Sequence, residues 1–260
     1  MRLRVLGCAG GSAPGAQLSC YLIDEVLAID AGALTTTLDF GAQRRVEDVL
    51  LTHGHLDHVW TLPLFLANRF GGAAVGCRLY GSSYTLETVR QHLFNDRIWP
   101  DFTEAVRGTV PLVKFIPLDP GETTRILGYE VTSCSLVHAV PSQAYRVRAH
   151  GHSLIVCGDT YSTEALWSFV NETKDLSAVL IECSFPSRYD WLAKASLHLT
   201  PKLLGAELKR LRADVPVLVT HIKPEDANEV KRELRALGDP RVRVLVDGET
   251  IELQPGSRTP

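Results

Sequence analysis

The stretch that most constrains this chain is Thr52–Val59, which reads Thr-His-Gly-His-Leu-Asp-His-Val. Four residues with metal-binding side chains fall within six positions of it: His53, His55, Asp57 and His58. The apolar segment Val46–Leu51 before it predicts a buried strand, and Val59–Phe70 after it predicts a helix that packs on a sheet. Because zinc and related divalent metals accept neutral imidazole and carboxylate as ligands, this strand, loop and helix predict a metal site. The alternative is a polar turn that is histidine-rich by chance.

Composition narrows the class of protein. The chain has 260 residues, enough to bury a full core, and we expect one domain over residues 1–260. The 27 basic and 30 acidic residues give a net charge of −3 without a Lys/Arg block, so a long nucleic acid is a disfavoured partner. No apolar run is long enough to span a bilayer, so we expect no membrane partner. An N-terminal apolar stretch broken by glycines, and six cysteines without a Cys-x-x-Cys pair, favour a cytoplasmic protein with reduced thiols.

Strands dominate the beginning and middle of the chain, and strands alternate with helices near its end. The predicted strands are Arg2–Leu6, Cys20–Ile23, Val26–Ile29, Val46–Leu51, Cys77–Tyr80, Val113–Pro117, Arg125–Leu127, Tyr129–Leu136, Gln143–Ala149, Ser153–Cys157, Ala178–Ile181, Val217–Thr220 and Val242–Leu245. The predicted helices are Leu34–Phe40, Val59–Phe70, Ser83–Phe94, Thr163–Val170, Lys202–Arg212 and Glu225–Leu237. This order predicts two sheets packed face to face with helices outside.

Four later polar residues stand at or near the ends of apolar segments: His138, Asp159, His198 and His221. Taken singly, such a histidine or aspartate is more often structural than a ligand. Taken together with the Thr52–Val59 loop, they predict a shared site, because strand ends on one edge of a sheet meet in one crevice.

Several of these segments together resemble the metallo-β-lactamase superfamily over nearly the whole chain, and more narrowly the class II cyclic-nucleotide phosphodiesterases. The motifs that carry the resemblance are His55-Leu56-Asp57-His58-Val59, Gly158-Asp159-Thr160, Glu182-Cys183-Ser184-Phe185-Pro186, His198-Leu199-Thr200-Pro201 and Thr220-His221-Ile222-Lys223-Pro224. One departure is Trp60-Thr61, where that family usually carries a small residue and glycine. The resemblance implies an α/β fold, a four-layer αββα sandwich with two mixed sheets packed face to face and helices outside.

The resemblance also implies two divalent metal ions and their ligands. One ion would be held by His53, His55 and His138, the other by Asp57, His58 and His221, with Asp159 bridging both. Position 55 is His and not the Glu of iron-dependent members, which favours a hydrolytic site. We expect zinc, with manganese or iron as alternatives.

The expected reaction is hydrolysis of a small phosphodiester, most of all a 3′,5′-cyclic nucleotide to the 5′-nucleotide. Two metals ~3.5–4 Å apart clamp the attacking and leaving oxygens of such a displacement, and a hydroxide that bridges them would attack. His198 is not needed as a ligand, so its expected role is general acid toward the leaving alkoxide. By resemblance Glu182 orients His198, although a helix cap or a surface ion pair is an equal alternative. Asp57 joins these two as an expected catalytic residue.

For several other polar or aromatic residues the sequence allows two roles. Asp30 is either an outer partner of a ligand histidine or a turn-forming aspartate. Asn95, Trp99 and Phe102 either wall the pocket or form a packed apolar lid, which we favour. His150-Gly151-His152 is interpreted as a hairpin turn, and His92 as a surface histidine.

Competing functions remain. A tRNA 3′-end processing endonuclease shares the His/Asp set and a Glu–His pair, but such enzymes usually carry a basic arm between the third histidine and the bridging aspartate. Only 21 positions separate His138 from Asp159 here. A lactonase, β-lactamase or arylsulfatase is a weaker alternative, and a non-catalytic metal-binding scaffold is weaker still, since no expected ligand is missing. The partner would be a small molecule, and a homodimer is possible.

Overall fold

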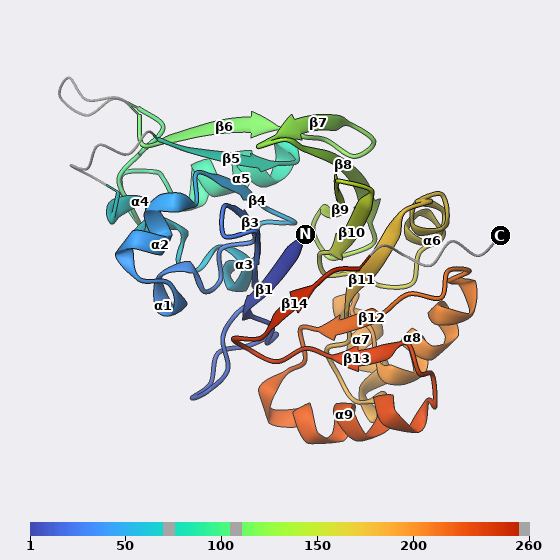
Figure 1. Cartoon of the computed structure of the whole chain (residues 1–260). Coiled ribbons are helices and arrows are strands. Elements are labelled where there is room, and N and C mark those ends of the chain that lie inside the picture. Colours follow the sequence, from blue (N-terminus) through green and yellow to red (C-terminus); the bar gives the residue numbers. More distant parts are fainter. Residues whose placement is uncertain (70–75, 105–110, 255–260) are drawn as a thin grey trace.

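The computed structural model describes residues 1–69, 76–104 and 111–254, and within them two seven-stranded sheets (Figure 1). The first sheet has the order β14-β1-β2-β3-β4-β5-β6. Its strands are β1 (Arg2–Gly7), β2 (Cys20–Ile23), β3 (Leu27–Ile29), β4 (Asp48–Leu50), β5 (Cys77–Gly81), β6 (Val113–Pro117) and β14 (Thr250–Glu252). The second sheet has the order β13-β12-β11-β10-β9-β8-β7. Its strands are β7 (Thr123–Ile126), β8 (Tyr129–Leu136), β9 (Ser142–Ala149), β10 (His152–Cys157), β11 (Leu176–Glu182), β12 (Val217–Thr220) and β13 (Val242–Val244).

Both sheets are mixed, and each joins an antiparallel part to a parallel part. In the first sheet β14, β1, β2 and β3 pair antiparallel, and β3 to β6 pair parallel. In the second sheet β7 to β10 pair antiparallel, and β10 to β13 pair parallel. The hairpin between β2 and β3 turns at Asp24 and Glu25, which both adopt positive φ (47° and 63°) without a glycine.

Helices cover the outer face of each sheet. Beside the first sheet lie α1 (Leu34–Thr37), α2 (Phe40–Arg45), α3 (Leu56–Val59), α4 (Leu62–Ala67) and α5 (Ser83–His92) (Figure 1). Beside the second sheet lie α6 (Glu164–Asn171), α7 (Asp190–Ser196), α8 (Pro201–Glu207) and α9 (Ala227–Ala236) (Figure 1). The described residues contain no helix that is both long and apolar enough to cross a membrane.

Alternation along the strands divides the core into three apolar layers. In β11, Ala178 and Leu180 face the first sheet, whereas Val179 and Ile181 belong to the layer under α6, α8 and α9. The layer between the sheets includes Leu50 of β4. A third layer joins the first sheet to its own helices. Because successive side chains of a strand point to opposite faces, a strand buried on both sides is apolar throughout. The predicted four-layer αββα sandwich is therefore confirmed.

One predicted helix is divided into two in the structure. The helix expected over Val59–Phe70 is replaced by α3 and α4, which break at Trp60-Thr61; Phe70 itself lies outside the described residues. Thr61 Oγ1 accepts from the backbone N–H of Leu34 and donates to the carbonyl of Ala31 at the break. Asp57 and His58 consequently lie in a helical turn and not in a loop.

The helix expected over Leu34–Phe40 also ends early, because Asp39 caps a new helix by accepting from the backbone N–H of Ala42 (2.7 Å). The helices expected over Lys202–Arg212 and Glu225–Leu237 are shorter, with 3₁₀ turns at Leu208–Arg210 and Pro224–Asp226. Helices α2 and α7 and strand β14 were not predicted.

Candidate metal and catalytic centre

The ends of strands from both sheets deliver the polar side chains to one place. Thr52 and His53 follow β4 of the first sheet, and α3 then presents Asp57 and His58. From the second sheet come three residues that follow β8, β10 and β12, respectively: His138, Asp159 and His221. The strand ends therefore converge as expected. They come from two facing sheets, however, and not from one edge of a single sheet.

The first group of ligand atoms comprises those of His53, His55, His138 and Asp159, which all lie within 4.8 Å of one another. His138 Nε2 is 3.2 Å from His55 Nδ1, and His53 Nε2 is 3.6 Å from Asp159 Oδ2. His53 is fully buried, and its Nε2 has no hydrogen-bond partner among the described residues. A buried, unpaired imidazole nitrogen aimed at a carboxylate and two further imidazoles fits a divalent cation.

The second group comprises Asp57, His58 and His221, and a third group, Asp159, His198 and His221, overlaps both of the others. His221 Nε2 lies 3.3 Å from Asp57 Oδ2, 3.3 Å from Asp159 Oδ2 and 3.3 Å from His58 Nε2. Asp159 Oδ1 is 3.4 Å from His58 Nε2. All seven residues predicted as metal ligands thus come together as two adjoining groups that share one carboxylate, which fits two divalent ions.

The other ring nitrogens of these histidines bind groups around the cluster. His58 Nδ1 lies 2.7 Å from Asp30 Oδ2, and His138 Nδ1 lies 3.1 Å from the carbonyl oxygen of Leu197. Asp30 is buried and therefore contacts a predicted ligand rather than only shaping a turn. Such outer contacts fix the ring orientation and keep the inner nitrogen available.

Hydroxyl groups make two further outer contacts that were not predicted from the sequence. Thr52 Oγ1 lies 3.1 Å from His53 Nδ1, and Ser184 Oγ lies 3.0 Å from His221 Nδ1. A serine or threonine has no sequence signature for this role. The available signal was position alone: Thr52 directly precedes the ligand loop, and Ser184 lies two residues after Glu182.

His198 and Glu182 form a pair beside the seven residues. His198 Nδ1 is 2.7 Å from Glu182 Oε1, and the His198 ring stacks on that of His221 (centroids 5.5 Å apart, planes 17° apart). Glu182 is buried and also accepts from the backbone N–H groups of Thr160 (3.0 Å) and Leu199 (3.3 Å). The carboxylate is therefore neither a helix cap nor a surface ion pair.

Electrostatics separates the histidines into two kinds. Burial and the neighbouring His58 hold the pKa of His53 well below its usual range. Burial alone would also lower the pKa of His58, but Asp159 and Asp30 raise it well above the usual range. For His198, burial lowers the pKa and Glu182 more than offsets this, so the net shift is upward.

The two carboxylates of the cluster stay ionised. Burial opposes the charge of Asp159, but His221 and His58 outweigh it and hold the pKa of Asp159 well below its usual range. The pKa of Asp57 is likewise lowered, by its hydrogen bond to His221 against the effect of burial. An ionised carboxylate is the form that binds a metal ion.

Backbone strain collects at the same place. Asp30 (φ 59°), Leu197 (φ 57°) and His221 (φ 60°) adopt the left-handed conformation without being glycine. Such strain persists where the surrounding structure over-determines it, and it concentrates at functional sites. Gly10 packs against His221 so closely that a Cβ there would lie 2.7 Å from the ring Nδ1.

The remaining candidates lie elsewhere. Trp99 and Phe102 pack against the apolar layer of the first sheet, as the favoured lid interpretation predicts. Asn95 accepts from the backbone N–H groups of Arg97 and Ile98 in a local turn. His150 (φ 53°) and Gly151 form the turn between β9 and β10, and His92 is exposed at the end of α5.

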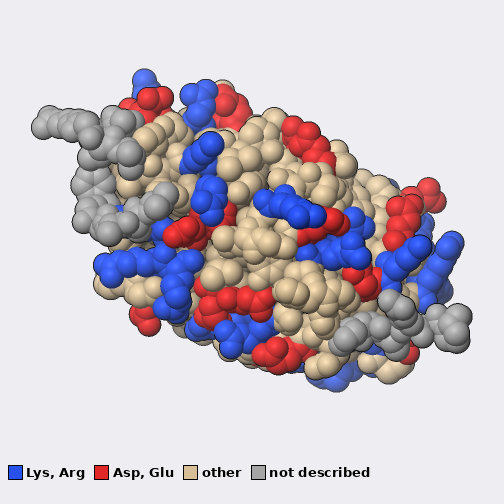
Figure 2. All heavy atoms as spheres, turned by 45° about the horizontal axis from the view of Figure 1, so that its top comes forward, with Lys and Arg blue, Asp and Glu red and all other residues tan. Residues whose placement is uncertain are grey.

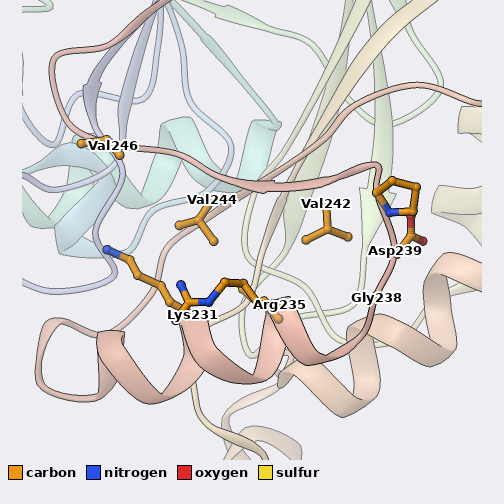
Figure 3. A pocket seen from close by; sticks show the side chains of 9 residues that line it. Lys231, Arg235, Gly238, Asp239, Val242, Val244 and Val246 are labelled. Carbon is orange, nitrogen blue, oxygen red and sulfur yellow. The ribbon is translucent and has the colours of Figure 1, made fainter.

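A separate cavity of about 560 Å³ lies between α9 and β13 (Figure 3). The side chains of Lys231, Arg235, Val242 and Val244 line it. None of the seven cluster residues borders it, so this cavity is distinct from the metal centre.

The layers and the cluster together define a metal-dependent hydrolase of the metallo-β-lactamase fold. The family model of the class II cAMP phosphodiesterases matches residues 33–252, and the chain belongs to this family. A 3′,5′-cyclic-nucleotide phosphodiesterase 1 from Saccharomyces cerevisiae is 27% identical over 253 residues, covering 80% of this chain and 68% of that protein. A ribonuclease Z from Bradyrhizobium is 26% identical over 265 residues, covering 80% of this chain and 82% of that protein.

Solved structures support the fold. That of unliganded yeast PDE1 superposes with a TM-score of 0.81 at 22% identity, covering 96% of this chain and 98% of that one. The metallo-β-lactamase fold protein YhfI from Bacillus subtilis superposes with a TM-score of 0.75 at 20% identity, covering 96% of this chain and 99% of that one.

Proposed function

We propose that this phosphodiesterase hydrolyses a 3′,5′-cyclic nucleotide to the 5′-nucleotide at the seven-residue cluster. The observation that carries phosphodiester hydrolysis is the His198–Glu182 pair, which lies against the cluster without belonging to the predicted ligand set. The choice of a small substrate rests on the short segment between His138 and Asp159. Family membership and the activity named for the yeast relative support the substrate class.

The ligands would divide between two ions. His53, His55 and His138 would hold one ion, Asp57, His58 and His221 the other, and Asp159 both. Two such ions, zinc in the first place and manganese or iron otherwise, neutralise the charge of the phosphodiester and generate the nucleophile from water. Asp57 would act as a catalytic residue through this ligand position.

The chain itself would supply the proton for the leaving group. Glu182 occupies Nδ1 of His198, which leaves Nε2 as the nitrogen that delivers a proton to the departing 3′ oxygen. The Glu182 contact raises the pKa of His198, in the direction that favours the protonated form. In this scheme Glu182 is a positioning residue.

Cleavage of pre-tRNA is the second candidate, because a ribonuclease Z is among the relatives. Residues 138–159, all of which the structure describes, contain only β9, β10 and the tight turn at His150-Gly151. No inserted arm is present in that segment. On the face that Figure 2 shows, acidic and basic side chains are interspersed and do not form one basic field. Both observations favour the small substrate.

The test is turnover by the metal-loaded protein of 3′,5′-cyclic AMP, 3′,5′-cyclic GMP, a pre-tRNA and a lactone, with the products separated by chromatography. We expect 5′-nucleotide from at least one cyclic nucleotide. Cleavage of pre-tRNA without turnover of either cyclic nucleotide would overturn the proposal.

The role of His198 is tested with His198→Ala and the matched surface change His92→Ala. We expect His198→Ala to lower kcat by ~10²–10⁴-fold with the metal content near two per chain. His92→Ala should leave both quantities unchanged. Loss of metal in His198→Ala would show that His198 is a ligand.

A further inference from the structure

We propose that Ser184 is a positioning residue that fixes, with one hydroxyl group, the protonated ring nitrogen of both His221 and His198. For His198 the inference rests on the proposed function, whereas for His221 it needs only the metal site. Ser184 would thereby join metal holding to proton delivery.

The contacts of Ser184 are unusually convergent. Its side chain is fully buried, and its Oγ lies 2.8 Å from Glu182 Oε2, 3.0 Å from His221 Nδ1 and 3.2 Å from His198 Nδ1. Each distance is within hydrogen-bond range, so one oxygen atom meets three groups.

Counting protons decides the direction of each bond. A hydroxyl has one proton to donate and two lone pairs, and a carboxylate can only accept. The Ser184 proton therefore goes to Glu182, and toward His221 the hydroxyl can only accept. His221 Nδ1 must then carry the proton, which leaves the lone pair on Nε2.

This tautomer is the one that a metal ligand requires at that place. His221 Nε2 lies 3.3 Å from both Asp57 Oδ2 and Asp159 Oδ2, at the centre of the second group. The opposite tautomer would place the lone pair of Nδ1 against the lone pairs of Ser184. Ser184 thus stabilises the ring in the form that is ready to bind.

The same count applies to His198. Its Nδ1 faces Glu182 Oε1 at 2.7 Å and Ser184 Oγ at 3.2 Å, and both partners can only accept from it. The proton of Nδ1 is therefore retained there, and exchange of a proton with substrate is confined to Nε2.

Thr52 repeats the device on the first sheet. Its Oγ1 lies 2.9 Å from Asp30 Oδ2, to which it donates, and 3.1 Å from His53 Nδ1, from which it accepts. By contrast, Ser177 Oγ lies 3.4 Å from His152 Nδ1 on the second sheet, away from the cluster, and has no carboxylate partner among the described residues. Ser177 is therefore a matched control for Ser184.

The experiment compares wild type, Ser184→Ala, Ser184→Cys and Ser177→Ala as full-length proteins. Chelator competition measures the affinity for each of two zinc ions, and ¹⁵N NMR of the histidine rings reports which nitrogen is protonated. We expect Ser184→Ala to weaken one of the two ions ~10–100-fold and leave the other unchanged. The Nδ1–H signal of His221 should broaden or disappear, and that of His198, which Glu182 still accepts, should shift.

Conservative replacement and the control complete the design. Ser184→Cys keeps a weak donor and acceptor in the buried position, so its zinc affinity and ring signals should fall between those of wild type and Ser184→Ala. Ser177→Ala should match wild type. If Ser184→Ala does not fold, Ser184→Cys alone decides between the two outcomes.

The contrary result is plain. Two zinc ions bound as tightly as in wild type, with unchanged His221 ring signals, in a folded Ser184 variant would overturn the inference. Failure of this inference and failure of the proposed function can be distinguished, because zinc affinity and the histidine ring signals are measured without substrate. A wild type that turns over no cyclic nucleotide would leave the His221 part of the inference standing.

Discussion

Two hydroxyl relays flank the metal centre, one from each sheet, and they are built alike. The Thr52 relay runs from His53 through Thr52 to Asp30, and the Ser184 relay runs from His221 through Ser184 to Glu182. In each, a buried hydroxyl lies within hydrogen-bond distance of a predicted ligand histidine and donates to a buried carboxylate.

The relays differ in what else their carboxylates contact. Asp30 Oδ2 lies 2.7 Å from a second predicted ligand histidine, His58, whereas Glu182 contacts His198, which lies outside the predicted ligand set. On one side the carboxylate contacts only predicted metal ligands among the histidines, and on the other side it also contacts His198, the proposed proton donor. We expect changes in the Thr52 relay to act on metal affinity, and changes in the Ser184 relay to act on turnover as well.

The residue common to both sides should give the largest effect. Among the described residues, Asp159 is the one carboxylate that contacts both groups of predicted ligands. Asp159→Asn should therefore weaken the binding of both ions more than ~100-fold, beyond the range for outer partners. Turnover should fall below detection. Metal content by mass spectrometry and a phosphodiester assay check this.

Asp175→Asn, which alters a partly exposed pair with Arg148, is the control. If Asp159→Asn retains two tightly bound ions, Asp159 does not connect the two sides of the centre.

Glu182→Gln should divide metal binding from catalysis. All seven predicted ligands remain, so we expect about two ions per chain, while kcat falls ~10²-fold or more because His198 loses its charged partner. Steady-state kinetics beside metal analysis provides the measurement. Glu207→Gln changes another buried glutamate, bonded to Ser162 and Trp167 instead, and should keep wild-type kcat. If Glu182→Gln loses metal and turnover to the same extent, the Ser184 relay acts through metal binding, as the Thr52 relay is expected to do.

Asp30→Asn should show the opposite behaviour, with weaker metal binding and a largely retained kcat. Asparagine tolerates the left-handed backbone of position 30, so the change removes charge from His58 and Thr52 without new strain. We expect affinity for the metals to fall ~10–100-fold, and kcat at saturating zinc to recover most of its value. A zinc titration of activity measures both. If kcat stays low at saturating zinc, Asp30 acts on the chemical step too.

The smallest effect is expected at the serine–histidine pair that lacks a carboxylate. His152→Ala should leave metal content and turnover unchanged and alter the free energy of unfolding by no more than ~0.5 kcal/mol. Denaturant unfolding and metal analysis test this. A loss of metal would mean that a lone hydroxyl–imidazole pair can influence the centre at a distance.

Local pattern predicted most of the fold. Strands β8 and β12 have the predicted bounds, Tyr129–Leu136 and Val217–Thr220, because buried strands are marked by their own apolar residues. Strand β14 has no such mark: Thr250–Glu252 is short and largely polar, and pairing with β1 makes it a strand. The division of the helix predicted over Val59–Phe70 could have been predicted from the sequence, because proline is not tolerated in a helix interior and Pro63 lies within that range.

Residues of the centre could be predicted from the sequence where their side chains are typical of metal sites. The dense motif Thr52–Val59 predicted four members of the cluster, and strand-end positions together with the family resemblance predicted the other three; the roles of all seven as ligands remain predictions. Thr52 and Ser184 could not be found in this way, because hydroxyl residues are common and their partners are set by the fold. The contacts of Asp30 and Glu182, two residues whose roles the sequence left open, follow from the same convergence of strand ends.

The close approach of distant segments at His221 bears on how the protein is made. The backbone N–H of His221 donates to the carbonyl of Cys8, Gly10 packs on its ring, and β14 pairs with β1. A chain is synthesised from its N-terminus, so Thr52–Val59 emerges from the ribosome long before residue 221. Its histidines then lack the other members of the predicted centre, so we expect complete metal loading only after residue 221 has been synthesised.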